Sequence, residues 1–182
     1  MSFKQAAVLA PVSFFLGVLF ICFNVDHRIL WGSAGLTSEV VADGFQFYAT
    51  FFNAPPAIKA LLHGMIGIGL IGTFSKLHKW DESAVFFDGS TLVAYVFSIA
   101  LYLTVTIPSL RTIVTPLAEE TKEVQVEALS VLCAGNVIII VCLLAILLLQ
   151  AGQEYARRQE ARELARVEKE QKDAAASVKK DQ

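Results

Sequence analysis

The stretch AIKALLHGMIGIGLIGTFS, residues 57–75, decides the fold class of this chain. Its only ionisable side chains are Lys59 and His63, and a helix over it is about 28 Å long, close to the hydrocarbon thickness of a bilayer. Glycine at this density weakens a helix in water, whereas in lipid it lets neighbouring backbones approach closely. The stretch therefore predicts a membrane-spanning helix that acts as a packing centre.

The small residues of this helix lie on two faces. On a helical wheel Ala60, Gly64 and Gly67 share one face, and Gly69 and Gly72 lie well around the helix from it. Two separate small faces predict that the helix has neighbours on two sides. The pattern is typical of a scaffold, and no catalytic group accompanies it.

The composition of the whole chain agrees with a membrane protein. Its 182 residues are 55% hydrophobic, with a mean hydropathy of +0.56, which is too apolar for an ordinary soluble domain. Four long apolar runs predict an all-α, polytopic fold with spans at about 5–23, 57–75, 90–110 and 128–149. We expect residues 1–151 to form one four-helix transmembrane domain and residues 152–182 a charged, helical, cytosolic tail.

The connection between the first two spans is long and rich in aromatic residues, which favours the membrane interface. Residues 38–52 predict a half-buried helix along that interface, with Ser38 as its N-cap. Pro55 and Pro56 then begin the second span, because proline is favoured in the first turn of a helix.

The two later connections carry different signals. Asp88, Gly89 and Ser90 predict a turn followed by a helix cap at the start of the third span. Residues 111–127 are acidic, and we expect them to be helical after Pro116.

The tail fixes the expected orientation. It alternates acidic and basic residues, with Glu154 and Arg158 one helical turn apart, and predicts a solvated helix continuing from the fourth span. It also holds more than half of the lysines and arginines, so the positive-inside rule places it in the cytosol. An even number of spans then puts the N-terminus there too, with the first and third connections facing the lumen or exterior.

The chain ends in Lys179-Lys180-Asp181-Gln182. An exposed, doubly charged cytosolic terminus of this form resembles the dilysine signal that returns membrane proteins to the endoplasmic reticulum (ER). The alternative is coincidence, because the tail is rich in lysine and arginine throughout.

A few residues within the spans are candidates for chemistry, each with a structural alternative. His63 is a candidate proton relay or ligand and Asn136 a candidate transport residue. For both the structural alternative is favoured: a neutral His63 bonded to a neighbouring helix or to interfacial water, and an interhelical hydrogen bond of Asn136. Cys22 and Cys133 lie near helix ends on the same predicted side and either pair or remain free; free buried cysteines are the commoner outcome.

The sequence offers no sign of an enzyme. It has no Ser/His/Asp set, metalloprotease motif or phosphate loop, and we expect no cofactor and no metal. The bases of the tail are balanced by acids, which argues against nucleic acid as a partner.

Two aromatic motifs connect the chain to a known family. They are FFNAPP, with Phe51, Phe52, Pro55 and Pro56, and FFDGS, with Phe86, Phe87, Asp88, Gly89 and Ser90. Together with the glycine-rich span between them, over about residues 10–150, they resemble the fungal ER membrane chaperones that package amino-acid permeases, whose domain is called "ER membrane protein SH3". This name is unrelated to the soluble peptide-binding SH3 fold.

The resemblance implies a function. Members of that family prevent newly inserted permeases from aggregating and help to load them into coated transport vesicles, while staying in the ER themselves. It implies that amino-acid permeases are partners of the protein, and that vesicle coat components and the lipid bilayer are further partners. It also implies that a client helix docks on one small face of residues 57–75. It transfers no catalytic residue. The open alternatives are a scaffold subunit of an ER membrane enzyme complex and a small transporter.

Overall fold

The computed structural model describes residues 3–33, 35–77 and 82–178, and within these ranges it contains helices and no strand. The elements are α1 (Phe3–Trp31), α2 (Ser38–Phe52), α3 (Pro56–Leu77), α4 (Glu82–Leu101), the π-helix η1 (Tyr102–Thr106), α5 (Ile107–Val114) and α6 (Lys122–Val178). Four segments are long and apolar enough to cross a membrane: α1, α3, the continuous run of α4, η1 and α5, and α6. The predicted all-α fold with four spans is confirmed.

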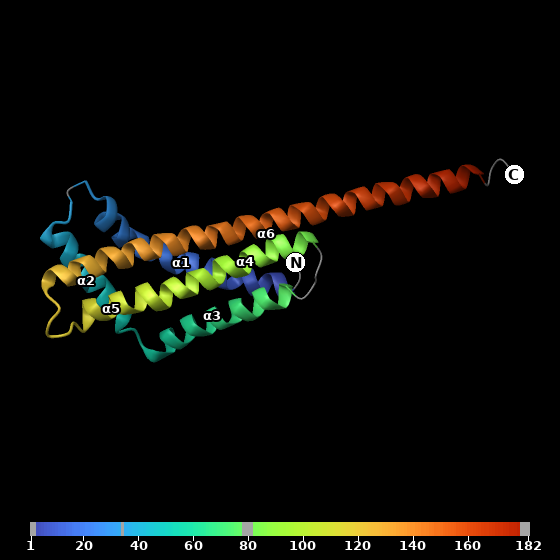
Figure 1. The fold of residues 1–182 in the computed structure, drawn as a ribbon. Coiled ribbons are helices and arrows are strands. Elements are labelled where there is room, and N and C mark those ends of the chain that lie inside the picture. Colours follow the sequence, from blue (N-terminus) through green and yellow to red (C-terminus); the bar gives the residue numbers. More distant parts are fainter. Residues whose placement is uncertain (1–2, 34, 78–81, 179–182) are drawn as a thin grey trace.

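The four spans form a ring in which α1 and α4 each pack against both α3 and α6. Figure 1 shows α2 and α5 gathered at one end of this bundle, and α6 running far beyond the other end. We call these the α2 end and the tail end. Helix α1 starts at the tail end, and α3 and α4 meet there (Figure 1).

Helix α4 begins eight residues before the expected span, and this corrects the prediction of a turn at Asp88, Gly89 and Ser90. All three lie inside the helix. The Asp88 side chain pairs with a lysine of α3 and does not cap its own backbone. Of the three residues, Asp88 therefore serves a contact between helices, while a Cβ atom at Gly89 would meet nothing within 4 Å.

The connection between α1 and α3 also differs from the prediction, in where α1 ends and in which residue caps α2. Helix α1 continues to Trp31, past the expected end of the first span. Helix α2 has the predicted bounds, but its N-cap is Thr37, whose hydroxyl accepts a hydrogen bond from the Val40 N–H at 3.3 Å, so the cap is one residue earlier than Ser38.

The segment after Pro116 is not helical until Lys122, contrary to expectation. The Glu120 carboxylate accepts a hydrogen bond from the Leu117 N–H at 2.8 Å, and the Glu120 N–H donates to the Leu117 carbonyl at 3.0 Å. These local bonds close a turn, and helix formation resumes only after it.

The π-helix η1 has a local cause. Pro108 has no N–H and its ring excludes the carbonyl four residues earlier, so the α-helical ladder cannot continue across it. The Ile107 N–H instead bonds to the Tyr102 carbonyl, five residues back. Such single π turns are frequent at functional sites.

Helix α6 is continuous for 57 residues and passes without interruption through Gly152, where the tail was expected to begin. Its first part packs in the bundle, and the rest stands alone (Figure 1).

Two apolar clusters hold the bundle together. The cluster at the α2 end consists of Ile29, Tyr48, Leu110, Ile113, Leu129, Leu132 and Cys133. The other joins α1, α4 and α6 through Val8, Val12, Tyr95, Ile139, Leu143 and Ile146. Neither cluster has a fully buried member from α3, although Leu70 of α3 packs against the second one.

Candidate functional site

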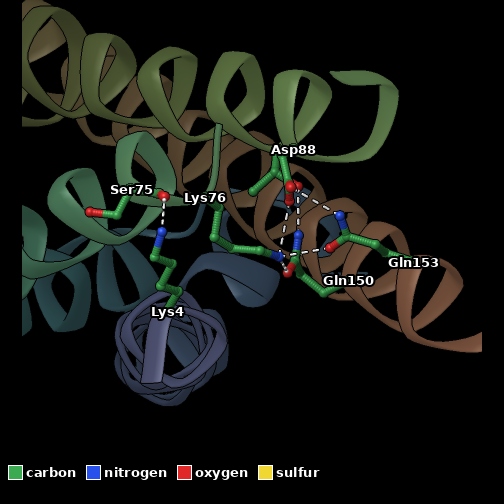
Figure 2. A network of polar contacts seen from close by, with 7 residues as sticks. Lys4, Ser75, Lys76, Asp88, Gln150 and Gln153 are labelled. Carbon is green, nitrogen blue, oxygen red and sulfur yellow. Dashed lines mark hydrogen bonds and ion pairs between the residues drawn. The ribbon is translucent and has the colours of Figure 1, made fainter. Parts of the chain in front are cut away.

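A buried ion pair fixes the tail end of α3. Lys76 and Asp88 lie 2.9 Å apart, and both side chains are almost fully buried. The Lys76 ammonium also donates to the side-chain oxygens of Gln150 and of Gln153, the latter at 2.7 Å (Figure 2). The Lys76 ammonium therefore donates two hydrogen bonds to amide oxygens, and the Asp88 carboxylate compensates its charge, as a buried ammonium requires.

The two glutamines close the network. Gln153 donates to the second Asp88 oxygen at 2.9 Å, and Gln150 donates to the Thr91 hydroxyl at 3.0 Å. Three helices are thereby joined, because Lys76 belongs to α3, Asp88 and Thr91 to α4, and the glutamines to α6. Removing one partner of such a pair leaves an uncompensated buried charge.

A second contact at this end joins α1 to α3. The Lys4 ammonium donates to the Ser75 backbone carbonyl at 2.9 Å (Figure 2). Helix α3 is thus held at the tail end from three sides.

A different polar network occupies the α2 end. The Tyr48 hydroxyl donates to the fully buried Asp26 carboxylate, and the Asn136 amide donates to the other Asp26 oxygen at 3.0 Å and to the Tyr48 oxygen at 2.9 Å. Burial, followed by the neighbouring Asp26 charge, raises the pKa of Tyr48 above its usual range, so its hydroxyl stays a donor. This network joins α1, α2 and α6 and does not include α3.

The predicted interhelical bond of Asn136 is therefore confirmed. Cys22 and Cys133 are both buried and both free, so the structure favours the unpaired alternative.

The two small faces of α3 have different surroundings. A Cβ atom at Gly72 would lie 2.8 Å from the Ala7 backbone of α1, and one at Gly69 would lie 2.0 Å from the Tyr95 hydroxyl of α4. At Gly64 and Gly67 the same atom would meet nothing within 4 Å, and Ala60 is exposed. Gly69 and Gly72 thus pack inside the bundle, and the other face is open.

A cavity of about 290 Å³ lies beside the α2-end half of α3. Its lining comes from every helical element and includes Phe51 and Phe52 of the FFNAPP motif. His63 and Asn136, the two candidates for intramembrane chemistry, both line it as well.

His63 has partners on two helices. Its Nδ1 donates to the Lys59 carbonyl at 2.7 Å, and its Nε2 lies 3.4 Å from the Tyr102 hydroxyl of η1. This agrees with the structural interpretation of His63.

Two of the hydroxyls of the third span bond to carbonyls of their own span. Ser98 is buried and donates to the Ala94 carbonyl, and Thr104 donates to the Ala100 carbonyl. Thr106 differs, because its hydroxyl oxygen is buried without a hydrogen-bond partner in the structure.

The FFDGS motif lies at the tail end. Phe86 is exposed, whereas Phe87 points toward α6, where a Cβ atom at Gly152 would lie 3.3 Å from its ring. Lys179 and Lys180, the predicted retrieval signal, lie outside the described residues.

Sequence reasoning missed the members of both networks other than Asn136. Gln150 and Gln153 follow the most apolar run of the chain at a spacing that places them on one helix face, which is a readable signal. Asp26 follows the first apolar run without a basic residue one turn away, and nothing in the sequence indicates its partners. Among the described residues no cluster of His, Cys, Asp or Glu is suited to a metal.

Comparison with known proteins identifies the family. Neither the curated proteins nor the solved structures yielded a significant match. The family model described as "ER membrane protein SH3", a family of chaperones, matches residues 1–182, which extends the resemblance seen over residues 10–150 to the whole chain. This match agrees with the four membrane-spanning helices, and the chain belongs to the ER membrane protein SH3 family of chaperones.

Proposed function

We propose that this protein is an ER-resident chaperone that assists the folding of amino-acid permeases and their packaging into ER-derived transport vesicles. The observation that carries the proposal is the family match over the full length of the chain. Family membership also points to a role other than catalysis. Permeases are the proposed clients, and vesicle coat components are proposed as further partners.

The client-docking surface in this proposal is the open face of α3, formed by Ala60, Gly64 and Gly67. A permease that has not yet inserted all of its helices leaves polar and small residues in contact with lipid. A glycine-lined face lets such a helix approach closely, and each contact contributes about 1 kcal/mol or less, which permits release. The face is free in this structure, because a Cβ atom at Gly64 or Gly67 would meet nothing within 4 Å and Ala60 is exposed.

The proposed orientation places the tail end of the bundle in the cytosol and the α2 end in the lumen. Support comes from the lysine and arginine content of the tail and from the start of α1 at the same end. The terminal lysines would then be available to the retrieval machinery. Replacement of Lys179 and Lys180 by serine is expected to move the protein out of the ER, and unchanged localisation would exclude the signal.

Deletion of the gene tests the function. Permeases are expected to remain in the ER as aggregates, measured by surface transport and by sedimentation after detergent extraction. Normal delivery of permeases in the deletion strain would exclude the proposed function.

Leucine substitutions test the surface separately. The double variant Gly64→Leu, Gly67→Leu covers the open face and is expected to abolish permease delivery while the chaperone keeps its stability and abundance. Gly17→Leu is the matched control, since a Cβ atom at Gly17 also meets nothing within 4 Å but belongs to α1. If the double variant delivers permeases as well as the control does, the docking surface lies elsewhere.

A further inference from the structure

The cavity beside α3 opens sideways, toward the surroundings of the bundle. Lys59, His63 and Ile107 line it and are themselves exposed, so its mouth lies between α3 and the run of η1 and α5. Helix α3 reaches η1 through the side-chain contact of His63 with Tyr102, and in the described part of the chain it does not pack on α5. A membrane lipid therefore reaches the cavity without crossing the protein.

The polarity of the lining changes along the membrane normal. Toward the middle of the bundle the walls are mostly apolar and include Phe15, Leu19, Ile66 and Ile99. Two polar side chains at this level, Tyr95 and Ser98, each donate a hydrogen bond to a helix carbonyl. Toward the α2 end they include Lys59, the only lysine, arginine or carboxylate among the lining residues. No ion pair involving Lys59 occurs in the described part of the chain, and its ammonium lies over the Phe52 ring at 5.4 Å.

Thr106 supplies an independent indication of a ligand. It lines the cavity, and its buried hydroxyl oxygen has no partner in the structure, which costs free energy unless a bound molecule pairs with it. His63 of α3 faces Tyr102 of η1. Lys59 lies one turn before His63 and Thr106 about one turn after Tyr102, and the two helical segments run antiparallel. Lys59 and Thr106 therefore lie at similar depth on opposite sides of the mouth.

From this arrangement we infer that the cavity binds one acyl chain of an anionic phospholipid from the leaflet at the α2 end. The phosphate and headgroup pair with Lys59, and the Thr106 hydroxyl donates to an ester carbonyl, which lies just below the phosphate in a phospholipid. A cation at the mouth and apolar walls behind it match this molecule in charge and in polarity.

The position of the cavity separates it from the client-docking face. Helix α3 contributes Lys59, Leu62, His63 and Ile66 to its lining, and none of the glycines of the open face. The cavity is therefore a different site from the open glycine face of α3.

Native mass spectrometry of the purified full-length protein tests the inference, with dioleoyl-phosphatidylserine and dioleoyl-phosphatidylcholine as the added lipids. We expect one retained phosphatidylserine per chain. Lys59→Gln is expected to lower its retention about fivefold, the effect of one lysine near an anionic headgroup, and to leave phosphatidylcholine nearly unchanged. Thr106→Val is expected to weaken both lipids.

Ser98→Phe places a ring in the cavity and is expected to abolish retention of both lipids. Val93→Phe is its control on the same helix, because Val93 is exposed to lipid, and Lys122→Gln is the control for Lys59 because it is an exposed lysine at the same end. Circular dichroism and gel filtration verify folding, and Ser98→Leu replaces the phenylalanine variant if that one does not fold.

Retention that persists in a folded Ser98 variant, or equal losses in Lys59→Gln and Lys122→Gln, would overturn the inference. A second experiment places a photocrosslinker at Ile66 in cells. Labelling of a phospholipid supports the lipid site, and exclusive labelling of another polypeptide overturns the inference. No permease is present in the mass-spectrometric experiment, so its failure leaves the proposed chaperone function untouched.

Discussion

The two ends of the bundle are held together by different polar networks, one that includes α3 and one that does not. At the tail end, Lys76 and Asp88 join α3 to α4 and α6 through a buried ion pair, and Gly72 brings α3 against the α1 backbone. At the α2 end, Asp26, Tyr48 and Asn136 join α1, α2 and α6, and α3 takes no part. One helix is therefore fixed at one end and open at the other.

This difference shows how a small bundle can expose a surface without losing its fold. Half of α3 supplies the attachment, through Gly69, Gly72 and Lys76, all buried. The other half, which carries Gly64 and Gly67, is left free for other molecules. Four predictions test the contrast between the two ends.

The largest effect is expected from breaking the ion pair. Lys76→Met leaves a buried carboxylate without its cation and should lower the free energy of unfolding by about 3–5 kcal/mol, measured by titration with dodecyl sulfate in mixed micelles. The double variant Lys76→Met, Asp88→Leu should lose less than the sum of the single losses, because no lone charge remains. Arg158→Ala, which breaks an exposed pair in the tail, is the control and should change nothing measurable. Equal effects of Lys76→Met and Arg158→Ala would refute the attachment.

The next largest effect concerns the network at the α2 end. Asn136→Leu removes the donor to Asp26 and to Tyr48, and should cost about 3 kcal/mol, the upper range for an unsatisfied buried group. Amide hydrogen exchange should accelerate in α2 and remain unchanged around Lys76. Faster exchange at both ends alike would mean that the two networks are not independent.

A pair of glycine variants tests the two halves of α3 directly. Gly72→Ala places a methyl group against the Ala7 backbone and should destabilise the bundle by about 1 kcal/mol or more. Gly64→Ala meets open space and should be neutral, or stabilising by less than about 1 kcal/mol through helix propensity. Thermal unfolding of the two variants measures the difference in stability, and an equal loss of stability in both would argue against an open face at Gly64.

The smallest effect is expected at the surface of the α2 end. Arg28 and Asp43 form an ion pair at 2.9 Å between α1 and α2, with both side chains about half exposed. Arg28→Gln should lower stability by about 0.5 kcal/mol, and by less at high salt, because water and ions screen the pair. A loss as large as that of Asn136→Leu would show that the surface pair, rather than the buried network, holds α2.

Much of the fold was predictable from the sequence because long apolar runs identify membrane spans. The four spans followed from these runs, and the family resemblance followed from two short aromatic motifs and the glycine-rich span between them. The helix ends were less predictable. Asp88 and Gly89 have the composition of a turn, but the partner that keeps Asp88 inside a helix is Lys76, on a different span.

The candidate sites were also only partly predictable, because they depend on contacts between residues far apart in the sequence. The glycine positions were visible in the sequence, yet only the three-dimensional arrangement distinguishes the packed pair, Gly69 and Gly72, from the open pair. The cavity had no sequence signal, because its walls come from every helix. Its clearest marker, the unpartnered Thr106 hydroxyl, depends on the π turn imposed by Pro108.

The unbroken length of α6 also sets a clearance from the membrane surface. Its 57 residues make a rod about 85 Å long, and about 40 Å of it extends past Leu149, where the apolar run ends. The potential of charged headgroups decays within about 8 Å at physiological ionic strength. The far end of the rod is therefore outside the electrostatic reach of the bilayer, so a protein that binds there meets only the charges of the helix itself.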